Sequence, residues 1–262
     1  MALMLAVGLV TTFILLGCAR SAASAPSESE LFKDCNLEKV VLPDTVSNVM
    51  LTYEGFTVGF NPEMHMPNYV VWTLEPSEVN GEFRRSDVQF MPDQRVKGCA
   101  SLDDYRNSGF DRGHMAPAAD MKWSAQSMAD CHLLTNMCPQ DKRLNAGAWA
   151  TVENNARRWA VKHGDLVIIA GPVLTDRLTR SIGSTPLPVP ERFFKVILAP
   201  KADPPMGIGF IMSNSYIEGG AQSTVVTIDE VESITGFDFF SELPDSIERV
   251  VEQQSKLIMW NK

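Results

Sequence analysis

The sequence predicts a mixed α+β fold in which a central antiparallel sheet is flanked by helices. Short runs of β-branched and aromatic residues recur between turn-forming residues, which is typical of strands. One long segment carries apolar residues at helical spacing. After an apolar N-terminal segment, roughly 240 residues remain, enough for one large domain with a substantial core.

The N-terminal segment predicts export. Residues 1–17 are almost wholly apolar but shorter than the roughly 20 residues of a membrane-spanning helix, which favours a signal peptide. Their end, Leu-Leu-Gly-Cys, resembles the lipobox of bacterial lipoproteins, so Cys18 is the predicted lipidation site and membrane anchor. No Lys or Arg precedes the apolar run, and Ala23-Ser24-Ala25 is a second small-residue cleavage site. A periplasmic or secreted form, and then a mitochondrial presequence, are the alternatives.

Residues 18–48, including the polar stretch Ser21–Glu30, are interpreted as a tether, and residues 49–262 as the domain. The domain opens with two predicted strands, Thr52–Phe60 and Tyr69–Leu74, with Asn61-Pro62 and Met66-Pro67-Asn68 as breakers between them. Further β segments are predicted at Leu133–Met137, beside the strand of residues 111–114, and at Leu166–Ala170, Phe193–Leu198, Ile208–Met212 and Thr224–Ile228.

Two helices are predicted in the second half of the chain. Trp149, Val152, Ala156 and Trp159 recur at near-helical spacing ahead of Gly164, which predicts a helix over Ala146–His163. A C-terminal helix is predicted over Ile247–Ile258. Apart from Cys18, the cysteines are Cys35, Cys99, Cys131 and Cys138, and in an exported chain this even count favours disulfides over buried thiols without fixing the pairing.

The net charge of −9 is unfavourable for a protein that holds a polyanion, but the charge is unevenly distributed. Residues 1–83, 84–163 and 164–262 sum to −7, +3 and −5. A phosphate-binding surface needs only local positive charge, because charges beyond a Debye length are largely screened. Ordinary surface charge explains the same numbers.

The most informative stretch is Asp111-Arg112-Gly113-His114. In a strand, Arg112 and His114 share one face. An arginine that meets charge on phosphorus and a histidine that deprotonates water are what phosphodiester hydrolysis requires. Alone, these four residues are better explained by a partly buried structural histidine.

Two downstream motifs favour the catalytic interpretation of His114. They are Thr135-Asn136-Met137-Cys138-Pro139-Gln140, and Asn145 followed by Trp149 and Glu153. With Asp-Arg-Gly-His, they stand in the order and at the spacing of the DNA/RNA non-specific endonucleases of the ββα-metal class. Roughly from Leu51 to Leu243, the chain resembles this family and its endonuclease G branch in particular.

The resemblance implies a role for each motif residue. His114 is the expected general base, and its other ring nitrogen needs an acceptor that fixes the tautomer. Asn136, on the adjacent strand, is expected to hold this neighbourhood, although it could equally satisfy backbone groups at a strand end. Asp111 is expected to anchor the motif turn or pair with an arginine, and Trp149 to belong to the core.

The resemblance also implies one metal ion, Mg²⁺ with Mn²⁺ as the alternative. Asn145 is the expected direct ligand. Glu153 lies eight residues on, about 12 Å along a helix axis, and would reach the ion through a water. The competing interpretations are a helix N-cap for Asn145 and a solvated helix face for Glu153.

Arg112 and one upstream arginine are expected to contact the phosphate. Arg85 fits the family pattern better than Arg84, although one extra residue separates it from Phe90. Lys142 and Arg143 are further candidates for phosphate binding, with solvated surface charge as the alternative.

These residues predict a metal-dependent nuclease that cuts DNA and RNA without sequence preference, since contacts to phosphate carry no base information. The alternatives are an exported, catalytically silent nucleic-acid-binding protein of the same fold and a phosphodiesterase for a small substrate. The family includes homodimers, so a homodimer is a further expectation.

Overall fold

The computed structural model describes residue 32 and residues 34–175 and 177–262. The predicted signal peptide (1–17), Cys18 and the stretch Ser21–Glu30 lie outside the described residues, so these assignments stay predictions. Within the described part of the chain, no helix is long and apolar enough to span a membrane.

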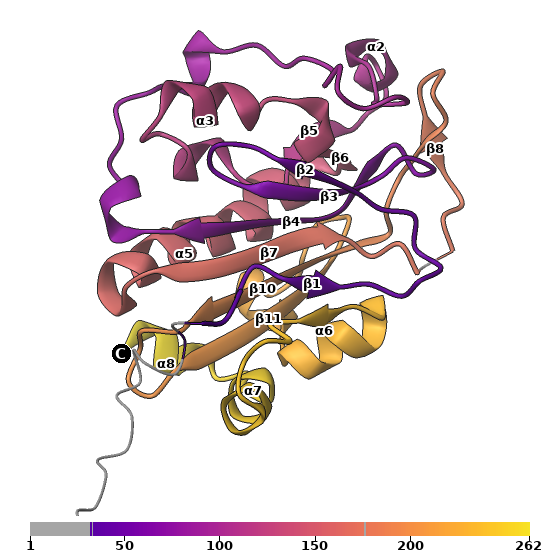
Figure 1. Cartoon of the computed structure of the whole chain (residues 1–262). Coiled ribbons are helices and arrows are strands. Elements are labelled where there is room, and N and C mark those ends of the chain that lie inside the picture. Colours follow the sequence, from indigo (N-terminus) through magenta and orange to yellow (C-terminus); the bar gives the residue numbers. More distant parts are fainter. Residues whose placement is uncertain (1–31, 33, 176) are drawn as a thin grey trace, which may run out of the picture.

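The domain is built around one seven-stranded antiparallel sheet with the order β12-β11-β10-β7-β4-β3-β2 (Figure 1). This confirms the predicted α+β class. The strands are β2 (Val49–Thr52), β3 (Thr57–Asn61), β4 (Met66–Leu74), β7 (Leu166–Pro172), β10 (Arg192–Ala199), β11 (Met206–Ser213) and β12 (Val225–Val226).

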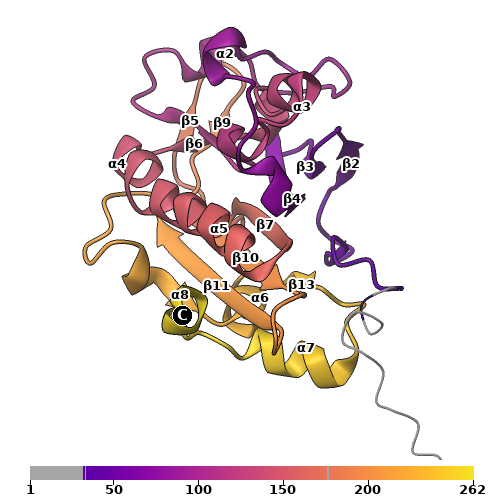
Figure 2. The same cartoon turned by 90° about the vertical axis from the view of Figure 1, so that its left-hand side faces the viewer.

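The sheet is the middle layer between two apolar cores. Successive residues of a strand point to opposite faces. On the central strand β7, Ile168 belongs to the core under α5 (Ala150–His163), whereas Ile169 belongs to the core under α6 (Ile228–Thr235) and α7 (Asp245–Glu252). Figure 2 shows α5 on one side of the sheet and α6 on the other.

A separate two-stranded ribbon lies on the α5 side: β5 (Asp111–His114) and β6 (Met137–Gln140). Its buried residues His114, Met137 and Cys138 place it against the main body. The remaining elements are β1 (Val40–Val41), β8 (Ser181–Ile182), β9 (Leu187–Pro188), β13 (Asp238–Phe239), α2 (Leu102–Tyr105), α3 (Ala125–Asp130), α4 (Lys142–Leu144), α8 (Leu257–Asn261), a π-helical turn at Asn145–Trp149, and 3-10 turns at Pro76–Glu78, Arg85–Asp87, Ala118–Asp120, Leu134–Asn136 and Ala221–Thr224.

The domain begins earlier than residue 49. Val40 is buried and pairs with Phe239, and Val41 pairs with Asp238. The predicted tether, residues 18–48, therefore ends in a segment that is part of the fold.

Four of the predicted strands have different bounds. The strand predicted at Tyr69–Leu74 begins at Met66, so the predicted breakers Met66-Pro67-Asn68 belong to β4. Thr52–Phe60 is not one strand but the hairpin β2–β3, because the Tyr53 amide donates to the Phe56 carbonyl (2.9 Å) and closes a tight turn. Leu133–Met137 contains a 3-10 turn, and its strand starts only at Met137. Thr224–Ile228 keeps two strand residues, because the Thr227 side chain caps α6.

The helix predictions hold in outline. The predicted helix Ala146–His163 starts with the π-helical turn and ends at Gly164, whose φ of 87° favours glycine. The predicted C-terminal helix is interrupted between Glu252 and Leu257. Among the described residues, Cys99, Cys131 and Cys138 carry free thiols, so the predicted disulfides do not form there, and burial raises their pKa values.

Candidate active site

The Asp-Arg-Gly-His motif forms strand β5 and is positioned by β6. His114 pairs with Met137 at one end of the ribbon. Close contact between the strands needs a glycine, because a Cβ at Gly113 would lie 2.5 Å from the Cβ of Gln140. The motif therefore places its histidine on a strand with little freedom to shift.

His114 is buried, with 8% of its surface exposed. Its backbone carbonyl accepts a hydrogen bond from the indole Nε1 of Trp149 (3.2 Å), which fixes the end of β5 against the start of α5. Desolvation, then the nearby His132, Arg85 and Arg112, lower the pKa of His114 well below its usual value. The ring is therefore neutral near pH 7 and able to accept a proton.

The Phe90 ring lies near the His114 ring and near both candidate arginines. Its ring centroid lies 5.4 Å from that of His114, 4.4 Å from Cζ of Arg112 and 5.8 Å from Cζ of Arg85. As strand geometry predicts, Arg112 and His114 thus reach the same side of β5. The Nε of Arg112 is buried and has no partner in the described part of the chain, so it is available as a donor.

The arginines face a polar cavity of about 240 Å³. It is lined by Arg85, Phe90, Tyr105, Phe110, Asp111, Arg112 and Asn145. Arg84 is not among these residues. The cavity therefore combines two guanidinium groups with one carboxylate and one amide.

Asn145 is held by Asp111. The side-chain Nδ2 of Asn145 donates to Oδ2 of Asp111 (2.9 Å), which leaves its Oδ1 available as an acceptor. Asn145 has helical backbone angles at the C-terminal end of α4, and the residue that caps the start of this helix is Asp141, so the N-cap interpretation is wrong. Amide and carboxylate oxygens suit Mg²⁺, and the residues present therefore fit a hard divalent ion.

Asn136 uses its whole amide on backbone groups. Its Oδ1 accepts from the Ala116 amide (2.9 Å), and its Nδ2 donates to the carbonyls of Ala116 and Cys131 (2.9 Å each). It fixes the chain two residues beyond His114. Among the described residues, its side chain makes no hydrogen bond with the His114 ring.

Glu153 contacts a buried lysine instead of the cavity. Its Oε1 lies 3.8 Å from Nζ of Lys195, which is 1% exposed and stands 4.1 Å from the centre of the Trp149 ring. Desolvation raises the pKa of Glu153 to about 7, against the opposing effect of Lys195. The solvated-face interpretation is wrong, since only 15% of this side chain is exposed.

The two peripheral basic candidates, Lys142 and Arg143, lie on α4 and are exposed. Arg143 already pairs with Asp141 (2.8 Å). Neither lines the cavity.

Tyr105 and His132 were missed as site residues by sequence reasoning. Tyr105 lines the cavity, and His132 contacts the His114 ring. No motif marks either of them.

A model of the DNA/RNA non-specific endonuclease family matches residues 34–246. The chain belongs to this family. Its members are metal-dependent hydrolases, which agrees with the oxygen ligands and arginines around the cavity.

The individual proteins to which the chain is similar are also nucleases. The chain is 32% identical over 223 residues to the mitochondrial Nuclease 1 of Schizosaccharomyces pombe, covering 78% of this chain and 69% of that protein. It is 31% identical over 209 residues to the human mitochondrial nuclease EXOG, of which it spans 56%. It is 26% identical over 268 residues to a nuclease of Nostoc sp., covering 92% of this chain and 94% of that one.

A solved structure titled as the EndoG/EndoGI complex matches with a TM-score of 0.71. The match covers 84% of this chain and 94% of that chain, at 24% sequence identity. At this identity the likeness shows a shared fold.

Proposed function

We propose that this protein is a metal-dependent endonuclease that hydrolyses phosphodiester bonds in DNA and RNA without sequence preference. The observation that carries the proposal is the cavity in which Arg85, Arg112 and Asn145 converge, joined through Phe90 to His114. Two planar cations beside a neutral buried base match the needs of phosphate binding and water activation.

Each residue has a defined part. His114 takes the proton from the attacking water, while Arg112 and Arg85 donate to the phosphate oxygens as charge develops. Asn145, oriented by Asp111, would hold Mg²⁺, with Mn²⁺ as the alternative. Glu153, which contacts Lys195 and does not line the cavity, would reach the ion only through a water. When bound, the ion would stabilise negative charge on the phosphate and the leaving oxygen. Asn136 acts as a positioning residue through the backbone.

The decisive experiment uses the purified chain with circular DNA and with RNA, with and without added Mg²⁺. Cleavage of both substrates that depends on the metal supports the proposal. His114→Ala should lower the rate by about 10²–10⁴-fold while the far-ultraviolet circular dichroism stays unchanged. Binding without cleavage by the unmodified protein would instead support the catalytically silent binder, and cleavage of only small phosphodiesters the third alternative.

We further propose that the protein is exported and carries a lipid on Cys18, because its first 17 residues have the pattern of a lipoprotein signal peptide. Mass spectrometry of the mature protein tests this. An acylated N-terminal Cys18 that is lost in Cys18→Ser supports it. An unmodified protein starting after Ala25 would favour the periplasmic or secreted form.

The oligomeric state, for which a homodimer is our prediction, can be measured by light scattering.

A further inference from the structure

Two buried histidines face each other at the end of β5. The rings of His114 and His132 are nearly perpendicular (84°), with their centroids 5.1 Å apart. The Nε2 atom of each ring is buried and lacks a hydrogen-bond partner in the described part of the chain. Leaving a buried polar atom unpaired costs free energy, so two such atoms side by side call for a common explanation.

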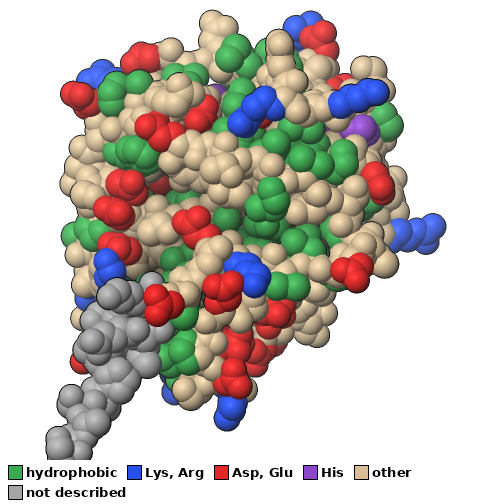
Figure 3. Space-filling model, viewed as in Figure 1, with side chains coloured by type: hydrophobic (Ala, Val, Ile, Leu, Met, Phe, Trp, Pro, Cys, Tyr) green, Lys and Arg blue, Asp and Glu red, His purple; other side chains and the backbone are tan. Residues whose placement is uncertain are grey.

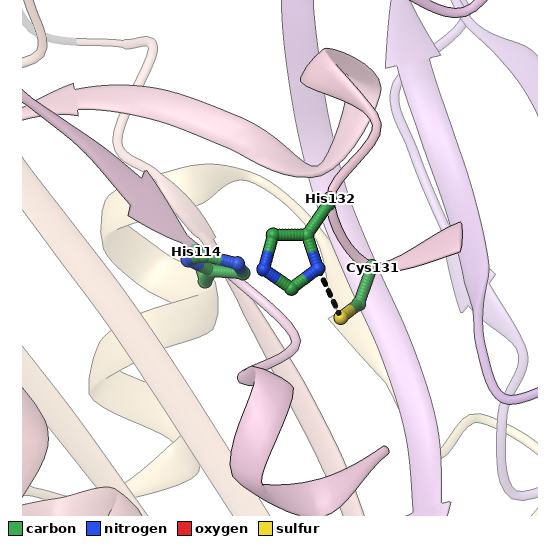
Figure 4. Close-up of side chains that lie close together, drawn as sticks. All are labelled: His114, Cys131 and His132. Atoms are coloured by element: carbon green, nitrogen blue, oxygen red, sulfur yellow. Dashed lines mark hydrogen bonds between the residues drawn. The ribbon is translucent and has the colours of Figure 1, made fainter. Parts of the chain in front are cut away.

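The tautomer of His132 follows from its other nitrogen. Its Nδ1 lies 2.8 Å from the backbone carbonyl of Met128, and a carbonyl can only accept. Nδ1 therefore carries the hydrogen. In the neutral ring, Nε2 is then a free acceptor. Figure 4 shows this nitrogen on the side of the ring that faces His114, while Nδ1 is turned toward Cys131.

His114 needs such an acceptor. If Nε2 of His114 carries the hydrogen, the lone pair of the His114 ring is on Nδ1. Of the two ring nitrogens, only Nε2 is both buried and without a partner in the described part of the chain. Asn136 is not the acceptor in the structure, because its side chain bonds the backbone of Ala116 and Cys131 and His114 Nε2 has no partner among the described residues. Phe90 contacts both histidine rings in a tilted arrangement, with centroid distances of 5.4 and 5.0 Å.

We propose that His132 is the positioning residue for His114: its Nε2 accepts a hydrogen bond from the His114 Nε2–H and so keeps the His114 Nδ1 lone pair directed at the attacking water. This rests on the proposed function of His114 as general base. When Nδ1 takes the proton, an O–H bond of the water breaks and an N–H bond forms. The resulting imidazolium keeps its Nε2–H bond to His132, which stabilises the added charge.

A metal ion is the competing explanation. One ligand atom each from His114, His132 and Cys131 lie within 4.8 Å of one another. However, the His132 ring stands between the other two side chains, and the nitrogen facing Cys131 is already bonded to Met128 (Figure 4). With Nδ1 bonded to Met128, only Nε2 of His132 is open to an ion, and this atom faces His114 and not Cys131, so the arrangement favours a histidine pair.

The test is nitrogen NMR of the imidazole rings in the ¹⁵N-labelled full chain, with His114→Ala identifying the His114 signals. The unmodified protein should show His114 in the Nε2–H tautomer and His132 in the Nδ1–H tautomer. The opposite tautomer of His114 would overturn the proposal. A metal ion bound by the unmodified protein but not by Cys131→Ala would overturn it as well, because it would show an ion held by the His114, His132 and Cys131 cluster.

Variants connect the tautomer to the reaction. His132→Phe keeps a ring but removes the acceptor, and it should lower kcat by about 10- to 100-fold with little change in KM. His132→Gln retains an acceptor oxygen and should recover most of this loss. Cys131→Ala, the matched control, should change neither the tautomer nor kcat. An unchanged kcat and His114 tautomer in a folded His132→Phe variant would refute the role.

The two proposals fail separately. If the unmodified protein shows the expected tautomers but cleaves no nucleic acid, the endonuclease assignment fails and the histidine pair stands. If it cleaves but His114 has the other tautomer, the pair fails and the endonuclease assignment stands.

Discussion

Asn145 and Glu153 illustrate how differently two residues of one motif are used. The Asn145 side chain faces the cavity with its oxygen free, because its nitrogen is bonded to Asp111. Glu153, on the following helix, is instead the nearest opposite charge of the buried Lys195. The two residues should therefore respond differently to substitution.

We predict that Asn145→Ala raises the Mg²⁺ concentration needed for half-maximal activity by at least about 10- to 100-fold, with little loss of stability. Glu153→Gln removes the carboxylate in contact with the buried Lys195 and leaves only the opposite charge of Asp120 acting on it, a loss that costs about 3–5 kcal/mol. At roughly 2–4 °C per kcal/mol, its Tm should fall by about 6 °C or more. Metal titration and calorimetry of both variants check this. A Glu153→Gln protein as stable as the unmodified one would show that the pairing with Lys195 contributes little.

For individual residues, the sequence was enough to identify those candidate site residues that lie in motifs. Arg112, His114 and Asn145 were found because chemistry and spacing mark them. His132 and Lys195 were not, because their roles come from contacts between segments that the sheet and ribbon bring together. Burial also decided between alternatives: it placed Glu153 beside a lysine that no local pattern connects to it.

At the scale of elements, the β5–β6 ribbon carries the most specific requirement. Gly113→Ala would push a methyl group into Gln140 and force the strands apart. We predict that this variant folds but loses at least about 10-fold in activity, because a 1 Å displacement of a catalytic group can cost about 10²-fold. The double variant Gly113→Ala/Gln140→Gly removes the obstructing side chain and should recover activity. Failure of this rescue, with the fold intact, would contradict the steric explanation.

The sequence predicted which segments are regular better than where they end. Strands β7, β10 and β11 lie close to their predicted bounds because their apolar runs are buried on both faces. The β2–β3 turn was missed, since Glu54-Gly55 interrupts a β-rich run without a proline or a paired glycine. The end of the helix at Gly164 was predicted correctly because a left-handed residue there has a clear sequence signature.

At the scale of the molecule, acidic residues gather on the side of the sheet opposite the cavity. Figure 3 shows acidic side chains over the region of α6 and α7. Carboxylate oxygens of Asp229, Glu232 and Glu252 lie within 4.8 Å of one another. Desolvation, followed by nearby carboxylates such as Glu232, raises the pKa of Glu252 to about 9, and desolvation raises that of Glu232 to about 7.

These shifts predict that the protein loses stability as pH rises. Glu252 holds a proton in the folded state up to about pH 9, whereas the unfolded chain releases it near 4.5. Its favourable contribution is therefore complete below pH 4.5 and is lost as the pH rises through this window. Glu252→Gln cannot ionise and should raise Tm at pH 8 by at least about 2–4 °C, but change it little at pH 4.5. The exposed Glu218→Gln serves as control; equal effects of both variants would refute the assignment.

The positive charge of residues 84–163 leads to a prediction about nucleic-acid binding. Lys142→Ala should weaken binding to DNA and RNA equally and flatten the slope of log K against log salt by about one unit. Arg143→Ala should have a smaller effect, because Arg143 is already paired with Asp141. Titrations with Ca²⁺ in place of Mg²⁺ measure this, with the distant Lys256→Ala as control. A slope unaffected by Lys142→Ala would remove that residue from the binding surface.

The separation of charge across the sheet also affects how the molecule approaches its substrate. Acidic side chains lie over α6 and α7 on one face, and Arg85 is exposed beside the cavity on the other, so we expect the protein to have an electric dipole. In the field of a polyanion, this dipole experiences a torque that turns the acidic face away before contact. An acidic enzyme can thus meet a strand of like charge in the reactive orientation, and a larger share of its collisions become productive.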